Sequence, residues 1–135
     1  MKTYNQIKST HQTNYNKILE QNQVFWAFSD EQLQKGIKKY NINKDNKMVS
    51  IGMGGYMPLK YNKRIQEQMK EEDKRYKKEL KEMREEQDGA ILYELNNHEC
   101  FYTGDIEDVV TLFKGIFTPA KIKKVFLKHQ KENVL

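Results

Sequence analysis

The spacing of apolar residues in the middle of the chain predicts one long helix over residues 59–97. Apolar side chains recur there every three, four or seven residues, which is the repeat of a single helix face. They are Ile65, Met69, Tyr76, Leu80 and Met83, and the stripe continues through Gln87 and Ala90 into Ile91, Glu94 and Leu95. The stripe is thin, and it is interrupted at Glu72 and Asp73, where an apolar residue is missing. We therefore expect a largely solvated helix that packs by one edge on its own domain. A dimeric or antiparallel coiled coil through the stripe is the alternative.

A second interpretation of this stretch ends the helix at Asp88-Gly89, a dipeptide typical of turns. Residues 90–103 would then form a β-hairpin. Because Ile91, Leu92 and Leu95 extend the helical stripe, the continuing helix is favoured, and the hairpin stays open as an alternative.

The pattern before the long helix predicts an N-terminal helix within residues 1–22, which frays at its start, and a small β-α-β unit at 23–58. In this unit, strands are expected at 24–28 and 47–51, with a short antiparallel return at 56–57. Ser29 and Gln32 form a capping box for a helix from residue 30 to about residue 40. The expected core residues of the unit are Trp26, Phe25 or Phe28, Val49 and Ile51.

Two shorter helices are expected over residues 105–131. Asp105 is a suitable N-cap for the first, Gly115 ends it, and Thr118-Pro119 starts the second. The fold class is therefore predicted to be α+β and mostly helical, as a single domain over residues 1–135.

Composition limits the setting of the protein. The 135 residues are 37% hydrophobic and 32% charged, and the only cysteine is Cys100. A single cysteine excludes an internal disulfide and suits a reducing cytoplasm. No apolar run is long enough to cross a membrane. We expect a cytoplasmic protein without a membrane partner.

Charge is distributed unevenly within a net charge of +5. Residues 89–113 hold five acids and no base, whereas residues 114–135 hold six lysines and one acid. Four of these lysines lie on one face of the last predicted helix, opposite Ile122, Val125 and Phe126: Lys121, Lys124, Lys128 and Lys131. This ridge is about 15 Å long and could meet several phosphates or an acidic protein. Lys123 on its flank, and Lys74, Arg75 and Lys78 on the long helix, complete the candidate binding residues. An ordinary solvated lysine face is the alternative.

Candidate catalytic and metal-binding groups are sparse. Gly52-x-Gly54-Gly55 lacks the rest of a phosphate loop and is interpreted as a tight turn. His98-x-Cys100 has no second ligand pair for zinc, so His98 is expected to cap a helix end and Cys100 to fill apolar space. We expect no cofactor, no metal and no enzymatic activity.

Three segments of the chain resemble small uncharacterised proteins of phages and prophages. They are Phe25-Trp26-Ala27-Phe28-Ser29, Ser50-Ile51-Gly52-x-Gly54-Gly55, and Ile91-Leu92-Tyr93-Glu94-Leu95-x-Asn97-His98-Glu99, the last followed by Tyr102-Thr103-Gly104-Asp105. The similarity spans about residues 24–118. Those proteins are known as a domain of unknown function, so no activity or site residue is transferred. The resemblance implies a mobile-element setting and a helix around residues 90–97.

Three functional hypotheses follow. The first is a non-enzymatic phage or mobile-element accessory protein that binds a host protein or ribonucleoprotein effector, by analogy with anti-CRISPR inhibitors of host defence. The second is direct nucleic-acid binding by the C-terminal lysines, with Tyr or Phe stacking. The third is a small metal-dependent nuclease that uses Glu99, Asp105 and Asp108. A homodimer through the long helix is compatible with each.

Overall fold

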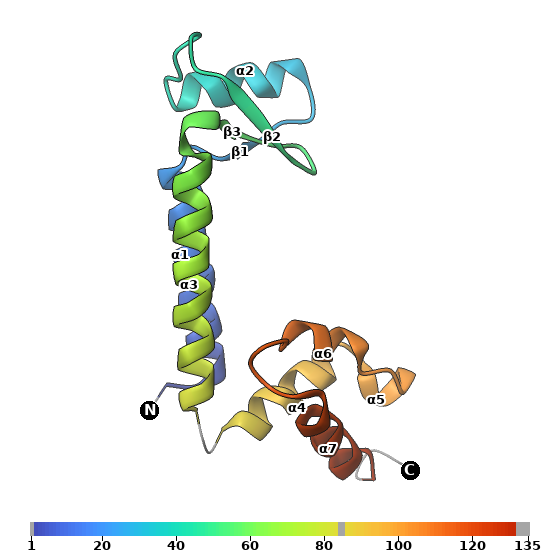
Figure 1. Cartoon of the computed structure of the whole chain (residues 1–135). Helices are drawn as coiled ribbons and strands as arrows, with labels where there is room; N and C mark the ends of the chain where they lie inside the picture. The colour runs from blue at the N-terminus through green and yellow to red at the C-terminus, as the bar shows by residue number, and fades with distance from the viewer. Residues whose placement is uncertain (1, 84–85, 132–135) are drawn as a thin grey trace. The chain divides into compact units, whose positions relative to one another are not determined.

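The computed structural model of the chain describes residues 2–83 and 86–131, which belong to two compact units (Figure 1). Ser9–Lys74 form the first, called here the sheet unit. Met1–Lys8 and Arg75–Leu135 form the second, called the helical unit. Helices α1 (Tyr4–Gln21) and α3 (Asn62–Glu82) each contribute residues to both units. The expectation of a single domain over residues 1–135 stays a prediction.

The sheet unit contains a three-stranded antiparallel sheet with the strand order β1-β3-β2. Its elements are β1 (Phe25–Trp26), α2 (Asp30–Lys39), β2 (Met48–Gly52) and β3 (Gly55–Pro58). Strands β2 and β3 form a hairpin, and β1 pairs with the other side of β3, with Phe25 opposite Tyr56. The predicted strands and helix of residues 23–58 are thus confirmed, with β1 shorter than expected.

Helix α2 begins at the predicted capping box and packs closely on the sheet. Ser29 Oγ accepts a hydrogen bond from the Gln32 N–H at 3.2 Å, and Gln32 Oε1 accepts one from the Phe28 N–H at 2.7 Å. A Cβ atom at Gly36 would lie 2.1 Å from the Phe25 ring, so only glycine permits this approach of helix to strand. The buried residues between α2 and the sheet are Phe25, Ala27 and Ile42.

The glycine-rich segment is the tight turn of the β2–β3 hairpin, as predicted. Gly52 and Gly55 are paired, so Met53 and Gly54 form a two-residue loop. Their φ angles are 53° and 83°, and a type I′ turn requires positive φ at both central residues.

The prediction that Trp26 and Ile51 fill the core of this unit is wrong. Phe25 is buried, but Trp26 and Ile51 are 51% and 45% exposed, and Phe28 is 76% exposed. Successive side chains of a strand point to opposite faces, so Trp26 lies on the face away from α2. On that face, residues of α1 and α3 cover only the part formed by Val24, Val49 and Met57.

The gap in the apolar stripe of α3 is filled by a polar contact with α1 inside the sheet unit. Glu72 is buried, and Asn14 Nδ2 donates to both of its carboxylate oxygens at 3.1 Å. His11 Nδ1 lies 3.1 Å from Glu72 Oε1, and the Tyr15 hydroxyl donates to Asp73. Burial, and then this hydrogen bond to Asp73, raise the pKa of Tyr15. A buried carboxylate needs such partners, which explains why an apolar residue is missing from the stripe.

The helical unit packs the C-terminal half of the chain around one core. Its helices after α3 are α4 (Gln87–Asn97), α5 (Cys100–Thr103), α6 (Glu107–Leu112) and α7 (Pro119–Gln130). The most deeply buried core residues come from α1, α3, α4 and the C-terminal segment: Ile7, Leu80, Ile91, Leu95, Val109, Phe113 and Ile122. Helix α4 covers residues 90–97, so the helical interpretation is confirmed and the hairpin alternative is wrong.

The single long helix predicted over residues 59–97 is wrong. After a short 3₁₀ turn at Leu59–Tyr61, α3 ends at Glu82, and α4 begins at Gln87. In one continuous helix, Leu80 and Ile91 would be about 16 Å apart along the axis. Both side chains instead lie in the same core, together with Phe113. Burial in a shared core therefore outweighs the helix propensity of the charged residues between them.

The remaining elements agree with the predicted fold class. A mostly helical α+β fold is confirmed, and α6 and α7 are the two helices expected within residues 105–131. Asp105 Oδ1 accepts a hydrogen bond from the Glu107 N–H at 2.9 Å, but the N-cap of α6 is Ile106, one residue after the predicted Asp105. In the part of the chain that the structure describes, no helix combines the length and the apolar character that a membrane span requires.

Candidate binding surface on the C-terminal helix

Helix α7 owes its position to a strong start signal and a buried apolar face. Thr118 Oγ1 accepts a hydrogen bond from the Lys121 N–H at 3.1 Å, and Pro119 is the first helical residue. Both features were predicted, because a hydroxyl cap followed by proline favours a helix start. Ile122, Val125 and Phe126 are buried against the core, so the lysines on the other face are held on a packed helix.

Three lysines of the predicted ridge line one surface groove of about 610 Å³. They are Lys121, Lys124 and Lys128, and the other lining residues are Asp88, Ala120 and Val125. Lys124 and Lys128 are exposed, and in the described ranges no carboxylate lies within ion-pair distance of either ammonium group. Lys123 and Lys131 are also exposed but do not line the groove. The structure therefore brings together three of the five C-terminal candidates.

Lys121 differs from its neighbours because it is partly engaged. Its ammonium group donates a hydrogen bond to Gln87 Oε1 and lies 5.4 Å from the centroid of the Phe117 ring. Gln87 Nε2 in turn donates to the Lys81 carbonyl at 3.0 Å, at the end of α3. Lys121 thus connects α7 to Gln87 of α4. Lys124 and Lys128 are the groove lysines that remain available to a ligand.

A second groove with basic residues lies beside the start of α7 and was not predicted. It measures about 560 Å³, and Lys81 and Lys114 line it together with Gly115 and Phe117. Lys77 is close by, since a Cβ atom on Gly115 would lie 3.5 Å from its Nζ atom. Lys81 and Lys114 are 33 residues apart by their numbers in the sequence, so no local spacing could have indicated that they share a surface.

The candidates on α3 do not join the α7 groove. Arg75 Nη1 lies 2.6 Å from Glu79 Oε2, and Lys2 Nζ lies 2.9 Å from Glu79 Oε1. The hydrogen bond from Lys2, and then that from Arg75, lower the pKa of Glu79. Lys78 is exposed on α3, and Lys74 belongs to the sheet unit. Arg75 therefore has a structural contact, and partner binding by Lys74 and Lys78 stays a prediction.

A buried carboxylate in the helical unit was missed by the sequence analysis. Glu94 is 1% exposed, and Lys8 Nζ lies 2.8 Å from its Oε1 atom. The predicted cap residue His98 does follow the last residue of α4, and its Nε2 atom lies 3.5 Å from Glu94 Oε2. Burial, and then the neighbouring Tyr76 and Glu94, raise the pKa of Tyr4. The sequence around α4 gave no signal for the Lys8–Glu94 pair, because the two residues are 86 positions apart in the chain.

The residues considered for metal or nucleophilic chemistry lie apart from this groove. Cys100 is buried as predicted, and burial, followed by Asp105 and Asp108, raises the pKa of its thiol. Within residues 2–83 and 86–131, no three His, Cys, Asp or Glu side chains gather as metal ligands. Glu99 has a left-handed backbone with φ of 56° just before α5. Asp105 accepts a hydrogen bond from the Glu107 N–H in the first turn of α6.

Comparison with known proteins gives a family but no function. Neither the curated proteins nor the solved structures include a significant match to this chain. A family model described as "Family of unknown function (DUF7659)" matches residues 3–132, which is nearly the whole chain. The chain therefore belongs to the DUF7659 family.

Proposed function

We propose that this protein is a non-enzymatic accessory protein of a phage or another mobile element. It acts in the host cytoplasm by binding a nucleoprotein defence effector, as anti-CRISPR inhibitors do. The α7 groove is the proposed contact, and Lys124 and Lys128 bind phosphates of the effector's nucleic acid or acidic side chains beside them.

One observation carries this proposal: the exposed ammonium groups of Lys124 and Lys128 share a groove on a firmly packed helix. Lysines without an ion pair to a local carboxylate need not break such a pair when they bind phosphate. Each phosphate contact also releases counterions. The second groove, with Lys81 and Lys114, extends the basic character around the start of α7. Several phosphates can therefore be met within one helical unit.

Direct binding of free nucleic acid is the second candidate, because the same lysines support it. The two candidates differ in what the protein recognises. An inhibitor of a nucleoprotein also reads the protein surface of the effector, whereas a nucleic-acid binder needs only the phosphate chain.

The test compares a purified RNA-guided effector, assembled with its guide RNA, with the same guide RNA alone. Binding is measured by biolayer interferometry, and target cleavage by the effector is followed with and without the protein. The variant Lys124→Gln/Lys128→Gln removes two charges from the groove. The variant Lys44→Gln/Lys63→Gln removes two exposed charges from the sheet unit and is the matched control.

We expect the wild type to bind the assembled effector and inhibit cleavage, the groove variant to bind about tenfold more weakly, and the control variant to match the wild type. Equal binding of the guide RNA alone would instead support the nucleic-acid binder. No binding to either sample, or equal binding by the two variants, would contradict the proposal.

A further inference from the structure

The sheet unit has a strand edge whose main-chain groups point away from the sheet. Strand β1 lies at the end of the order β1-β3-β2. The Ala27 N–H donates to the Gly54 carbonyl at 2.8 Å, and Trp26 lies opposite Gly55. Hydrogen-bonded and non-hydrogen-bonded pairs alternate along antiparallel strands. The N–H and C=O of Trp26 are therefore directed to the outer edge of β1.

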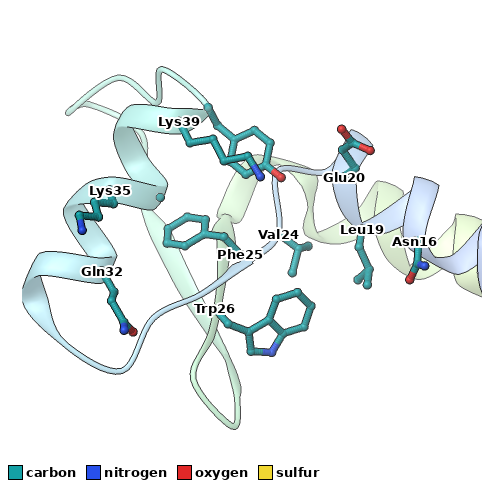
Figure 2. Close-up of a pocket in the computed structure, with 11 residues that line it drawn as sticks. Asn16, Leu19, Glu20, Val24, Phe25, Trp26, Gln32, Lys35 and Lys39 are labelled. Atoms are coloured by element: carbon teal, nitrogen blue, oxygen red, sulfur yellow. The ribbon is translucent and has the colours of Figure 1, made fainter.

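This edge opens into a groove of about 640 Å³ in the sheet unit. In Figure 2, β1 is marked by Phe25 and Trp26. Leu19 and Glu20 line the groove wall on the α1 side, and Lys35 and Lys39 line the wall on the α2 side. Trp26 lies in the groove and is 51% exposed. The groove thus combines main-chain donors and acceptors, the aromatic surface of Trp26, two ammonium groups on the α2 side and one carboxylate, that of Glu20, on the α1 side.

We propose that this groove binds an extended peptide segment of a partner protein, which adds a strand to β1. The segment carries an apolar residue between two acidic residues. Strand addition uses main-chain hydrogen bonds for affinity and alternate side chains for specificity. This inference does not depend on the proposed function, because it concerns another surface in the other unit.

The acidic–apolar–acidic pattern follows from the two walls. A residue opposite Trp26 in an added strand places its side chain on the same sheet face as Trp26, where Leu19 lines the groove. Its two neighbours point to the α2 face, where Lys35 and Lys39 line the groove. The central side chain is therefore apolar and the flanking side chains are acidic.

The charge of the groove favours a different protein over a second copy of this chain. Lys35 forms an ion pair with Glu31 at 3.4 Å, and both side chains are at least three-quarters exposed, so this pair holds Lys35 only weakly. Lys39 packs its ammonium group 5.1 Å from the centroid of the Tyr40 ring. Lys35 and Lys39 outnumber the one lining carboxylate, that of Glu20. Pairing of two β1 edges would therefore bring an excess of positive charge to one interface, whereas an acidic segment neutralises it.

The 135-residue chain supplies its own reporter, because Trp26 is its only tryptophan. The probe is a capped peptide with the sequence Thr-Glu-Ile-Glu-Thr, titrated while the tryptophan emission is recorded. One control peptide is N-methylated at the three central residues, which removes the main-chain donors for either strand direction. A second control replaces both glutamates by lysine.

The matching protein variant is Lys35→Glu/Lys39→Glu, and Lys38→Glu/Lys44→Glu is its control with the same charge change outside the groove. We expect saturable binding of the probe and at least about tenfold weaker binding of the N-methylated peptide. We expect the groove variant to bind the probe about tenfold more weakly and to prefer the lysine peptide, while its control behaves as the wild type. The far-UV circular dichroism spectrum of each variant confirms that it is folded.

Three outcomes would overturn the inference. The first is no saturable change in emission. The second is equal affinity for the probe and its N-methylated form, since the main chain would then take no part. The third is a dimeric mass by light scattering without peptide that is lost in Trp26→Lys, since a second copy would then occupy the edge.

Discussion

The two units offer different chemical groups to a partner. In the helical unit, the candidate surface consists of lysine side chains on α7, which packs by Ile122 on a core shared with Phe113. In the sheet unit, the candidate surface includes the main chain of Trp26, on a small sheet with two minor apolar clusters. The α7 surface depends on flexible lysine side chains, and the β1 surface depends on the position of the Trp26 main-chain N–H and C=O.

This difference has a physical consequence. Lysine ammonium groups sit on flexible stems and can adjust to a ligand, so the α7 surface needs only a packed helix. Main-chain groups at a strand edge cannot adjust in this way. Binding at α7 should therefore respond to charge and salt, whereas binding at β1 should respond to a small steric change beneath it.

The largest loss of unfolding free energy is expected from Phe113→Ala in the helical unit. Phe113 is 1% exposed, and its loss leaves a cavity under α6 and α7 that should cost about 3–5 kcal/mol of unfolding free energy. Urea unfolding followed by circular dichroism measures this loss. Its neighbour Leu112 is 45% exposed, so Leu112→Ala should cost much less, and equal losses for the two variants would contradict the assigned core.

Lys8→Met should have the next largest effect. It removes the ammonium group that lies 2.8 Å from the buried Glu94 carboxylate. The buried carboxylate then loses its nearest cation but keeps His98 Nε2 at 3.5 Å. Because a buried carboxylate without its main partner is unfavourable and Lys8 is partly exposed, we expect a loss of about 2 kcal/mol. The double variant Lys8→Met/Glu94→Gln should recover part of it, because the carboxylate is then absent. Lys123→Met is the control for removing an exposed lysine. Unchanged urea stability of Lys8→Met would show that the pair does not form.

Gly36→Ala tests the steric sensitivity of the sheet unit. The added Cβ would lie 2.1 Å from the Phe25 ring, so α2 or β1 must shift. We expect a loss of about 1–3 kcal/mol and weaker binding of the probe peptide at β1, with binding through α7 unchanged. At Gly89 in α4 an added Cβ meets nothing within 4 Å, so Gly89→Ala should stabilise the helix by about 0.5–1 kcal/mol. If Gly36→Ala changed neither the stability nor the binding of the probe peptide, the β1 surface would not be sensitive to steric change, and the proposed difference between the units would be contradicted.

The smallest expected effect is a pH dependence in the helical unit. The pKa of Glu79 is lowered by the hydrogen bond from Lys2 and then by that from Arg75. Its ionised form therefore contributes stability above the ordinary glutamate pKa, and this contribution is lost as the pH falls through the lowered value. Thermal unfolding at a series of acidic pH values should show a shallower fall for Glu79→Gln than for the wild type. Glu82→Gln, at an exposed position of α3, should follow the wild type, and the same slope for all three would exclude this contribution.

Elements with local signals could be predicted from the sequence. Ser29 and Thr118 mark the starts of α2 and α7, and each accepts the expected hydrogen bond. The lysine face of α7 also follows from sequence spacing alone, because a helix converts regular spacing into a shared surface. The gap at Glu72 was visible in the stripe, although its partners His11 and Asn14 were not.

Features that depend on distant residues could not be predicted. The division between α3 and α4 follows from the burial of Leu80 and Ile91 in one core, which overrides local helix propensity. The exposure of Trp26 depends on how much of its sheet face α1 and α3 cover. Strong β propensity indicated a strand there, but the choice of its buried face required the tertiary structure.

The measurement that tests the central claim most directly is the salt dependence of effector binding by the wild type and by Lys124→Gln/Lys128→Gln. If these two lysines contact phosphates, the slope of the logarithm of the association constant against the logarithm of the salt concentration should become shallower by about 1.5 in the variant. The control Lys44→Gln/Lys63→Gln should keep the wild-type slope. The same slope for the wild type and the groove variant would contradict phosphate contact by α7.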